Sequence, residues 1–243
     1  MATHRLSSIM LSCKNRLGIT SRRTRAAVAG AITAAAALTA AVVSTSPAHA
    51  NQFTYGPDVS SYEPDYNWSA SPAKFGIVKA TEGLDIRDAS FDRHWLEMAK
   101  KGIVRGAYHF GHPSDDPIAE ADHFLSVVNA EPAKSGDLLV LDLETSDGQS
   151  VSQVNSWAKT WLTYVKKKTG VTPLFYSNWD FANTYGEGLA SYPLWVAYYG
   201  RAQGDVAPPA GWKSWTIHQY TDTPIDQNVS FLSPEQLRLL GRH

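Results

Sequence analysis

Cysteine is nearly absent from this sequence. Of its 243 residues only Cys13 is a cysteine, and it lies in the N-terminal segment. The rest of the chain therefore has no disulfide framework, no thiolate nucleophile and no thiolate metal site. The sequence also lacks a Gly-x-Ser-x-Gly motif and a phosphate-binding glycine loop, which argues against the common serine-hydrolase and nucleotide-binding arrangements.

An excess of positive charge is absent as well. The first 50 residues hold six Lys and Arg and no acid, so the remainder carries 16 basic against 23 acidic residues, a net charge of −7. This balance argues against nucleic acid as a partner. His109 and His112 have a spacing that suits a metal, but no carboxylate pattern accompanies them, so we expect neither a metal nor a cofactor. The strand around His109 places it in a cleft or in the core.

Residues 1–50 have the organisation of an export signal. Basic residues precede an apolar run over residues 26–43, and an Ala-His-Ala sequence at residues 48–50 matches a small-x-small cleavage pattern. A retained membrane anchor is the alternative, since a run of about 18 apolar residues can span a bilayer, but this run is mostly alanine. We therefore predict a secreted, extracellular protein with no membrane anchor after signal removal, exported by the Sec or the twin-arginine route.

Residues 51–243 are enough for one domain with its own hydrophobic core. Short apolar, β-branched or aromatic runs recur between longer amphipathic stretches, which predicts alternating strands and helices. Strands are expected at residues 56–60, 75–80, 104–110, 138–144, 173–178, 194–199 and 215–220, and helices at residues 90–101, 117–129 and 152–168. The first and third helices are expected to end at Gly102 and Gly170, because glycine adopts a left-handed cap most easily. Trp157 and Trp161, four residues apart, are expected in the core.

The order of these elements predicts the fold class. Residues 138–141 are apolar on both faces, as expected of a central strand covered by helices in a parallel sheet. From Pro173 onward the strands follow each other too closely for full helices, and prolines interrupt the connections. The pattern predicts an α/β fold, a TIM-like (β/α) barrel whose later helices are missing or reduced.

Four acidic residues are the candidates for chemistry. Asp142 and Glu144 are two residues apart at the end of the central strand, so their side chains share a face, at the barrel end where active sites form. Asp58 and Asp226 lie where other strands should end. Structural ion pairing is the alternative for the first two, and turn capping for the others. Clustered acids raise one another's pKa, and we expect repulsion from Asp142, with Asp58 and Asp226 as more distant contributors, to keep Glu144 protonated as a general acid.

Aromatic and amide side chains at expected strand ends are candidates for lining a sugar-binding groove, because ring faces suit the apolar faces of sugars. They are Tyr108, Tyr176, Trp195, Tyr198 and Gln219. Packing inside the barrel is the alternative for each of them.

A series of short motifs, in order along nearly all of residues 51–243, resembles glycoside hydrolase family 25, the Chalaropsis-type lysozymes. The motifs are Asp58-Val59-Ser60 with Trp68 downstream, Phe75 to Gly83 (FGIVKATEG), Gly106 to Phe110 (GAYHF), Asp142-Leu143-Glu144, Tyr176-Ser177-Asn178, Leu194 to Tyr199 (LWVAYY), and Gln219-Tyr220 before Asp226. No single motif is specific, but their order is.

The resemblance implies a flattened, incomplete α/β barrel that acts on peptidoglycan glycan strands, and no metal. We expect the protein to be a monomer. The implied reaction is hydrolysis of the β-1,4 bond from N-acetylmuramic acid to N-acetylglucosamine. Glu144 is the implied proton donor, with Asp58, Asp142 and Asp226 as acidic partners. The sequence departs from the family at His218, where a tryptophan is common, and in the short segment 221–225 before Asp226, which puts the role of Asp226 in doubt.

Two other functions fit parts of the pattern. A chitinase-like endo-hexosaminidase also carries an Asp-x-Glu sequence at the end of a barrel strand. A barrel that binds wall glycan without cutting it is the second alternative, although the presence of all four acids argues against a decayed site.

Overall fold

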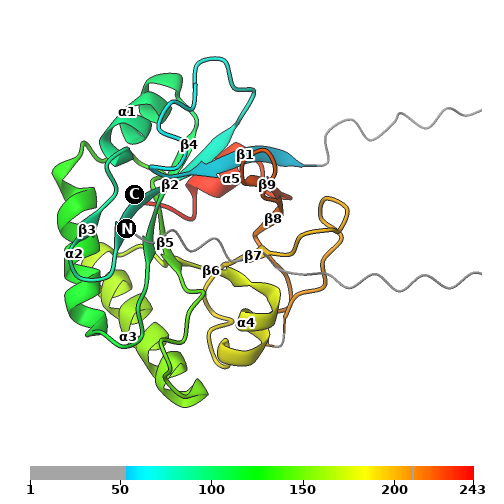
Figure 1. The fold of residues 1–243 in the computed structure, drawn as a ribbon. Coiled ribbons are helices and arrows are strands. Elements are labelled where there is room, and N and C mark those ends of the chain that lie inside the picture. The colour runs from blue at the N-terminus through cyan, green and yellow to red at the C-terminus, as the bar shows by residue number, and fades with distance from the viewer. Residues whose placement is uncertain (1–52, 210) are drawn as a thin grey trace, which may run out of the picture. The chain divides into compact units, whose positions relative to one another are not determined.

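The computed structural model describes residues 53–209 and 211–243. Their strands are β1 (Thr54–Val59), β2 (Phe75–Glu82), β3 (Ile86–Arg87), β4 (Val104–Phe110), β5 (Leu138–Asp142), β6 (Leu174–Asn178), β7 (Leu194–Ala197), β8 (Ile217–Thr221) and β9 (Gln227–Ser230). The strand order is β1-β9-β8-β7-β6-β5-β4-β2-β3, and β1 also pairs with β2. This second pairing closes a barrel, with β3 attached outside the ring (Figure 1). The predicted export signal lies outside the described residues.

The predicted α/β barrel is confirmed, with two strands that the sequence did not reveal. All seven expected strands are present with small shifts at their ends, and the strand expected over 138–144 ends at Asp142. The short β3 folds back on β2 as an antiparallel hairpin. The strand β9 is antiparallel to both β8 and β1, so it interrupts an otherwise parallel barrel.

The three predicted helices are present, and two short helices, α4 and α5, were not predicted. The helices are α1 (Phe91–Lys101), α2 (Pro117–Ala130), α3 (Val151–Thr169), α4 (Trp179–Tyr185) and α5 (Pro234–Arg238). Gly102 and Gly170 end α1 and α3 with φ of 78° and 74°, the left-handed conformation that glycine adopts at least cost. Ser150 and Gln153 form a reciprocal capping box at the start of α3.

Helices cover only part of the barrel. The long helices α1, α2 and α3 pack outside the strands β2, β4 and β5, whereas loops cover β7 and β8 (Figure 1). The described residues between β7 and β8 form no helix, and only the short α4 separates β6 from β7. The later helices are therefore reduced, as predicted. Among the described residues no helix combines the length and apolar character needed to cross a membrane.

Alternating side chains along the strands separate two apolar cores. The inner core fills the barrel and includes Phe75, Ile77, Val140 and Trp195. The outer core lies between the sheet and the helices and contains Trp157 and Trp161, as predicted.

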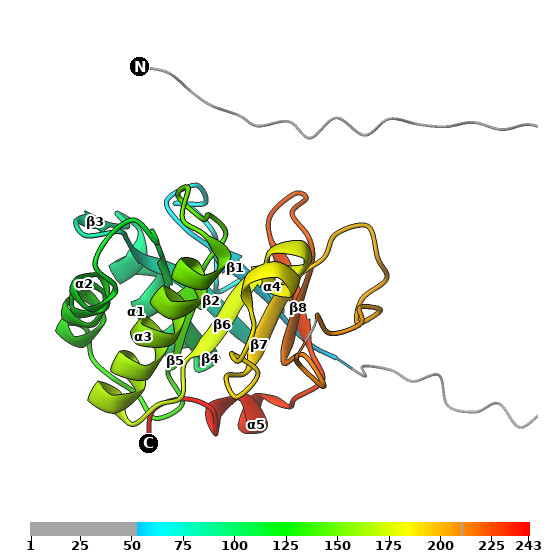
Figure 2. The same cartoon turned by 90° about the horizontal axis from the view of Figure 1, so that it is seen from below.

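The C-terminal segment closes the amino-end opening of the barrel. Leu237 of α5 packs into the inner core, and α5 lies at the end of the barrel opposite β3 (Figure 2). The segment is held to the start of β5, because Gly136 N donates to Arg242 O at 2.7 Å and Arg242 N donates to Asp137 O at 3.0 Å. The opposite, carboxyl end of the strands is left as the barrel mouth.

Candidate active site

Four acidic residues come together at the barrel mouth. Asp58 lies near the end of β1, Asp142 ends β5, Glu144 follows two residues later, and Asp226 directly precedes β9. Asp58 and Asp142 are 7% and 6% exposed, whereas Glu144 is an exposed residue. The four positions that the sequence singled out therefore lie at one end of one barrel.

The chain between Asp142 and Glu144 keeps the geometry of a strand although β5 has ended. Leu143 N donates to Tyr176 O at 3.0 Å, which continues the pairing with β6 by one residue. Leu143 is buried in the outer core. Because successive side chains alternate, Asp142 and Glu144 leave the chain on the other side, toward the mouth. The shared face predicted for the two acids is retained.

Two amide groups hold one oxygen of Asp58. Gln219 Nε2 and Asn228 Nδ2 donate to Asp58 Oδ1 at 2.9 and 2.6 Å. Amide side chains accept through oxygen and donate through nitrogen, so these two bonds require both amides to turn their nitrogens toward the acid.

The partners of the amide oxygens fix that orientation. Tyr176 and Tyr199 donate their hydroxyl hydrogens to Gln219 Oε1 at 2.8 and 2.7 Å. Trp195 Nε1 donates to Asn228 Oδ1 at 2.7 Å, and an indole nitrogen can only donate. A network from four strands, β6 to β9, and the exposed Tyr199 after β7 therefore orients Asp58.

Burial and mutual repulsion raise the pKa values of the acids. Burial raises the pKa of Asp58 to about 6, against the effect of its two amide donors. Burial, followed by repulsion from Asp58, raises the pKa of Asp226 to about 8. Burial and then the charge of Glu144 raise the pKa of Asp142 well above its usual range. Each of these carboxyl groups thus holds its proton to a higher pH than in water.

Glu144 differs from the expectation in the cause of its shift. Although the residue is exposed, crowding of its carboxyl group at the mouth reduces solvation and raises its pKa, and the negative charge of Asp226 raises it further. The expected repulsion from Asp142 is not among the causes for Glu144, whereas Glu144 does raise the pKa of Asp142. Asp226 therefore has a larger effect on the pKa of Glu144 than the sequence indicated.

Asp142 has a free acceptor. Its Oδ1 is buried and has no hydrogen-bond partner within the part of the chain that the structure describes. A buried carboxylate oxygen without a donor is unusual, because its desolvation is uncompensated.

Lys79 contributes positive charge to the site, and the sequence analysis gave it no role. Lys79 lies on the same face of β2 as the inner-core residue Ile77. Its Nζ is 2.6 Å from Glu82 Oε2. Its charge lowers the pKa values of Asp142 and Glu144 against the larger raising effects of burial. Its position within the FGIVKATEG motif was the available signal.

Three of the five predicted lining residues are near the acids. Tyr176 and Gln219 belong to the Asp58 network. Tyr108 packs against the inner core, and the charges of Asp142 and Asp58 contribute to a raised pKa of its hydroxyl after burial. Gln219 and Tyr176 are 1% and 5% exposed, so they hold Asp58 from below the surface of the mouth and do not form an open groove wall.

The other two positions correct the prediction of a lining role. Trp195 is 1% exposed and lies inside the barrel, with its ring centroid 4.3 Å from that of Tyr176. Tyr198 faces outward and stacks on Trp179 at 5.9 Å. The alternation along β7 explains both, since Trp195 and Ala197 point inward and Val196 points outward, which leaves Tyr198 outside. The next residue, Tyr199, contacts Gln219 instead.

Asn228 and Asn178 are further site residues that sequence reasoning missed. Asn228 holds Asp58, and Asn178 forms a side-chain hydrogen bond that lowers the pKa of Glu144. Each stands two residues from a residue that the sequence did single out, Asp226 and Tyr176. Period-two spacing from those residues was the signal that pointed to them.

His109 is held in the outer core. It is fully buried, with Nδ1 2.8 Å from Thr81 Oγ1 and Nε2 2.7 Å from Glu120 Oε2. Burial raises the pKa of Glu120 to about 8. Within residues 53–209 and 211–243 no group of three or more His, Cys, Asp and Glu side chains has an arrangement that could hold a metal ion.

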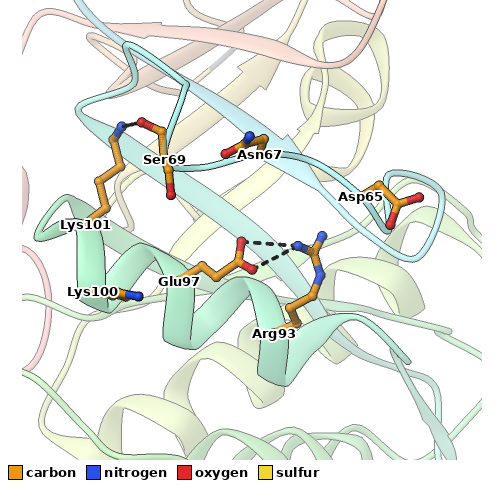
Figure 3. Close-up of a pocket in the computed structure, with 7 residues that line it drawn as sticks. All are labelled: Asp65, Asn67, Ser69, Arg93, Glu97, Lys100 and Lys101. Atoms are coloured by element: carbon orange, nitrogen blue, oxygen red, sulfur yellow. Dashed lines mark hydrogen bonds and ion pairs between the residues drawn. The ribbon is translucent and has the colours of Figure 1, made fainter.

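A polar pocket of about 600 Å³ lies elsewhere, between the segment after β1 and the outer side of α1 (Figure 3). Its lining residues are Asp65, Asn67, Ser69, Arg93, Glu97, Lys100 and Lys101. None of the four mouth acids lines it, and Arg93 is paired with Glu97 at 3.0 Å. The candidate active site is therefore the mouth and not this pocket.

Known proteins match the chain over most of its length. Residues 57–229 match the model of the glycosyl hydrolases family 25. The uncharacterized protein YegX of Escherichia coli K12 is 32% identical over 202 residues, which cover 76% of this chain and 72% of YegX. An N,O-diacetylmuramidase of Arthroderma benhamiae is 31% identical over 214 residues, covering 81% of this chain and 87% of that protein.

A solved structure supports the same relationship. The family 25 lysozyme of Aspergillus fumigatus superimposes with a TM-score of 0.71 at 27% identity, covering 79% of this chain and all of that one. The matched range 57–229 begins one residue before Asp58 and ends one residue after Asn228, so it includes every acid of the mouth. With its barrel, its acidic mouth and this match, the chain belongs to glycosyl hydrolases family 25.

Proposed function

We propose that this protein is a secreted lysozyme, an N-acetylmuramidase that hydrolyses the β-1,4 bond from N-acetylmuramic acid to N-acetylglucosamine in peptidoglycan. The observation that carries the proposal is the pair Asp142 and Glu144, which project from one strand to the mouth of a family 25 barrel with raised pKa values. The muramidase and lysozyme names of the relatives support the substrate.

In the proposed reaction Glu144 is the general acid. Its raised pKa keeps a proton available, and its exposure at the mouth lets the carboxyl group reach the glycosidic oxygen. The proton passes to the leaving oxygen as the bond to the anomeric carbon breaks, and water supplies the hydroxyl group of the new reducing end.

The other acids support that step. We assign to Asp142, which is 6% exposed at the mouth, the orientation of the 2-acetamido group. Above its pKa of about 6, Asp58, fixed by Gln219 and Asn228, supplies negative charge that stabilises the positive charge developing on the sugar. Asp226, with a pKa of about 8, adds charge only as the pH approaches that value. No cofactor enters the proposal, and we expect a monomer to be active.

Mass spectrometry of digested peptidoglycan tests the substrate assignment. Purified peptidoglycan is digested with the protein, the fragments are reduced with borohydride, and the reduced sugar is identified. A muramidase leaves reduced N-acetylmuramic acid at every new end. Reduced N-acetylglucosamine would instead identify a chitinase-like hexosaminidase, and intact glycan that still binds the protein would identify a binding barrel.

The export proposal has its own test. Residues 1–50 are proposed as a signal that is removed on secretion, by the Sec or the twin-arginine route. N-terminal sequencing of the protein from culture medium should begin near residue 51. Recovery of the full chain from cell membranes would contradict it.

A further inference from the structure

His112 joins two segments of the mouth that are far apart in the sequence. It lies between β4 and α2, with Nε2 3.2 Å from Glu82 Oε1 and Nδ1 3.2 Å from Asp147 Oδ2. Glu82 ends β2, whereas Asp147 lies in the segment between β5 and α3, three residues after Glu144. The imidazole therefore bridges carboxylates on two different segments.

Both neighbours of the ring are acceptors. A neutral imidazole carries one N–H and can donate to only one carboxylate, whereas the doubly protonated ring donates to both. Other acidic residues surround His112: its backbone N–H donates to the Glu120 carboxyl group, and Asp85 and Asp115 line the adjoining pocket of about 370 Å³. Each of the two ring nitrogens faces its own carboxyl group, on Asp147 and on Glu82.

Asp147 connects His112 to Thr145, the residue that follows Glu144. Asp147 has φ of 48°, the one positive φ of a non-glycine residue in the described part of the chain. Its Oδ1 accepts from Thr145 Oγ1 at 2.8 Å, its own N–H donates to the same hydroxyl at 3.1 Å, and its Oδ2 faces His112. Thr145 directly follows Glu144, so the bridge holds the residue next to the proposed acid. Unfavourable backbone conformations persist where surrounding contacts hold them.

Glu82 connects His112 to Lys79. The pairing of β2 with β4 shifts between Lys79 and Thr81, which places Glu82 in register with Phe110. Glu82 then accepts from Lys79 Nζ through Oε2 and from His112 through Oε1. The charge of Lys79 acts on Glu144. A continuous polar chain thus runs from Lys79 through Glu82, His112 and Asp147 to Thr145.

We propose that His112 is a positioning residue for Glu144. By bridging Glu82 and Asp147 it fixes the segment that carries the general acid relative to β2 and Lys79. The inference rests on the proposed function, in which Glu144 donates the proton, and adds to it a residue that does not touch the substrate. Misplacing a catalytic group by about 1 Å can slow a reaction by about 100-fold, so a bridge of this kind affects turnover more than binding.

The test compares His112→Gln with His112→Arg. Glutamine cannot donate to both carboxylates from two separated nitrogens, so kcat on a soluble glycan should fall by about 10- to 100-fold with KM nearly unchanged. Arginine donates through several N–H groups, and the adjoining pocket gives it room, so it should restore most of kcat. His123→Gln is the matched control, because His123 bonds only to the Ile86 carbonyl outside this chain and should leave kcat unchanged.

A double-mutant cycle isolates the bridge. Asp147→Asn keeps the shape of the side chain, and asparagine tolerates a positive φ. If the two residues act through one bridge, His112→Gln combined with Asp147→Asn should be no slower than the slower single variant. Independent losses that multiply would overturn the inference.

Hydrogen exchange of residues 143–150 separates this inference from the proposed function. Exchange there should be faster in His112→Gln and return toward the wild-type rate in His112→Arg. A wild-type protein that cuts no glycan would refute the proposed function, while exchange still reports on the bridge. An active wild type with unchanged kcat and exchange in His112→Gln would refute the inference alone. A loss of kcat that His112→Arg does not restore, accompanied by a general loss of stability, would also refute it.

Discussion

Trp195 Nε1 donates to Asn228 Oδ1 at 2.7 Å inside the barrel, and the nitrogen of the same amide donates to Asp58 at 2.6 Å. A residue of the inner core therefore determines how an acid at the mouth is held. The indole does not need to touch a ligand to influence Asp58, because the amide of Asn228 can serve Asp58 only while its oxygen has a separate donor.

Trp195→Phe should therefore lower the free energy of unfolding by more than the smaller ring alone would cause. Phenylalanine keeps an aromatic ring in the inner core but leaves Asn228 Oδ1 buried without a donor, a cost of about 1–3 kcal/mol. Trp161→Phe is the matched control, since Trp161 Nε1 is buried and has no partner among the described residues. Urea unfolding of both variants measures the difference. Equal losses in the two variants would show that the hydrogen bond contributes nothing.

Glu144→Gln should abolish turnover while the fold remains. Glutamine keeps the shape of the side chain but has no acidic proton for the leaving oxygen, so kcat should fall by about 100- to 10,000-fold or more. Glycan binding and the unfolding midpoint should stay close to those of the wild type. Glu187→Gln, at an exposed position on another segment, is the control. Near-normal activity in Glu144→Gln would remove Glu144 from the role of acid.

Asp226→Asn should move the alkaline limb of the pH–rate profile to lower pH. The negative charge of Asp226 adds to the raised pKa of Glu144. Removing that charge lowers this pKa, so Glu144 loses its proton at a lower pH and activity declines earlier as the pH rises. Because the pKa of Asp226 is itself raised to about 8, the two groups titrate together. The pH dependence of kcat for this variant and for Asp122→Asn, on the outer helix α2, is the measurement. A limb that stays in place would show that the two groups do not interact.

Arg105→Met should destabilise the barrel without changing its chemistry. Arg105 is 2% exposed and binds both oxygens of Asp137, at 2.6 and 2.9 Å, near the amino ends of β4 and β5. Removing one partner of a buried pair leaves the other charge uncompensated and costs about 3–5 kcal/mol. Lysine at this position should recover part of that loss, because it is charged but cannot form the bidentate pair. Urea unfolding tests the predicted loss of stability. The kcat at a temperature where all variants are folded tests whether the chemistry is unchanged. A loss below about 1 kcal/mol would place the pair among those of negligible effect.

Hydrolysis should proceed with net retention of configuration. Asp142 and Glu144 project from the same face of one strand, whereas two carboxylates of a conventional retaining enzyme flank the sugar about 5–5.5 Å apart and those of an inverting enzyme about 6.5–9.5 Å apart. Asp142 is then a poor nucleophile, but its carboxyl group can orient the acetamido group so that the acetamido oxygen faces the anomeric carbon. Proton NMR of the first-formed anomer is the measurement, with a thiazoline analogue as the expected inhibitor. Early appearance of the inverted anomer would assign Asp58 or Asp226 as the base that activates water.

Local signals in the sequence predicted most of the barrel. The four apolar residues before Asp142 predicted a covered strand, and Gly102 and Gly170 mark helix ends through their own backbone preference. The strand β9 gave no such signal. Its residues Gln227-Asn228-Val229-Ser230 look like a turn, because the inward position is a polar Asn228 whose burial depends on Asp58 and Trp195.

The parts of the candidate site that depend on residue spacing along one strand were predictable from the sequence. The contacts between strands that are far apart in the sequence were not. Period-two geometry places Asp142 and Glu144 on one face without any knowledge of the fold. The contact of Asp58 with Asn228 joins residues 170 positions apart, and no local pattern contains it. The prediction of Tyr198 failed for a different reason, since the strand was recognised without establishing which of its residues point inward, and Tyr199 contacts Gln219 instead.

The pairing of β1 with both β2 and β9 has a consequence for the time at which the barrel can form during synthesis. Thr54 in β1 is in register with Ser230 in β9. During synthesis one edge of β1 therefore stays unpaired until β9 has been made. Until then a nascent chain exposes a strand edge that can associate with other chains. Contacts between such distant segments also slow folding. Protection of that edge during synthesis is therefore a requirement that this barrel places on the cell that makes it.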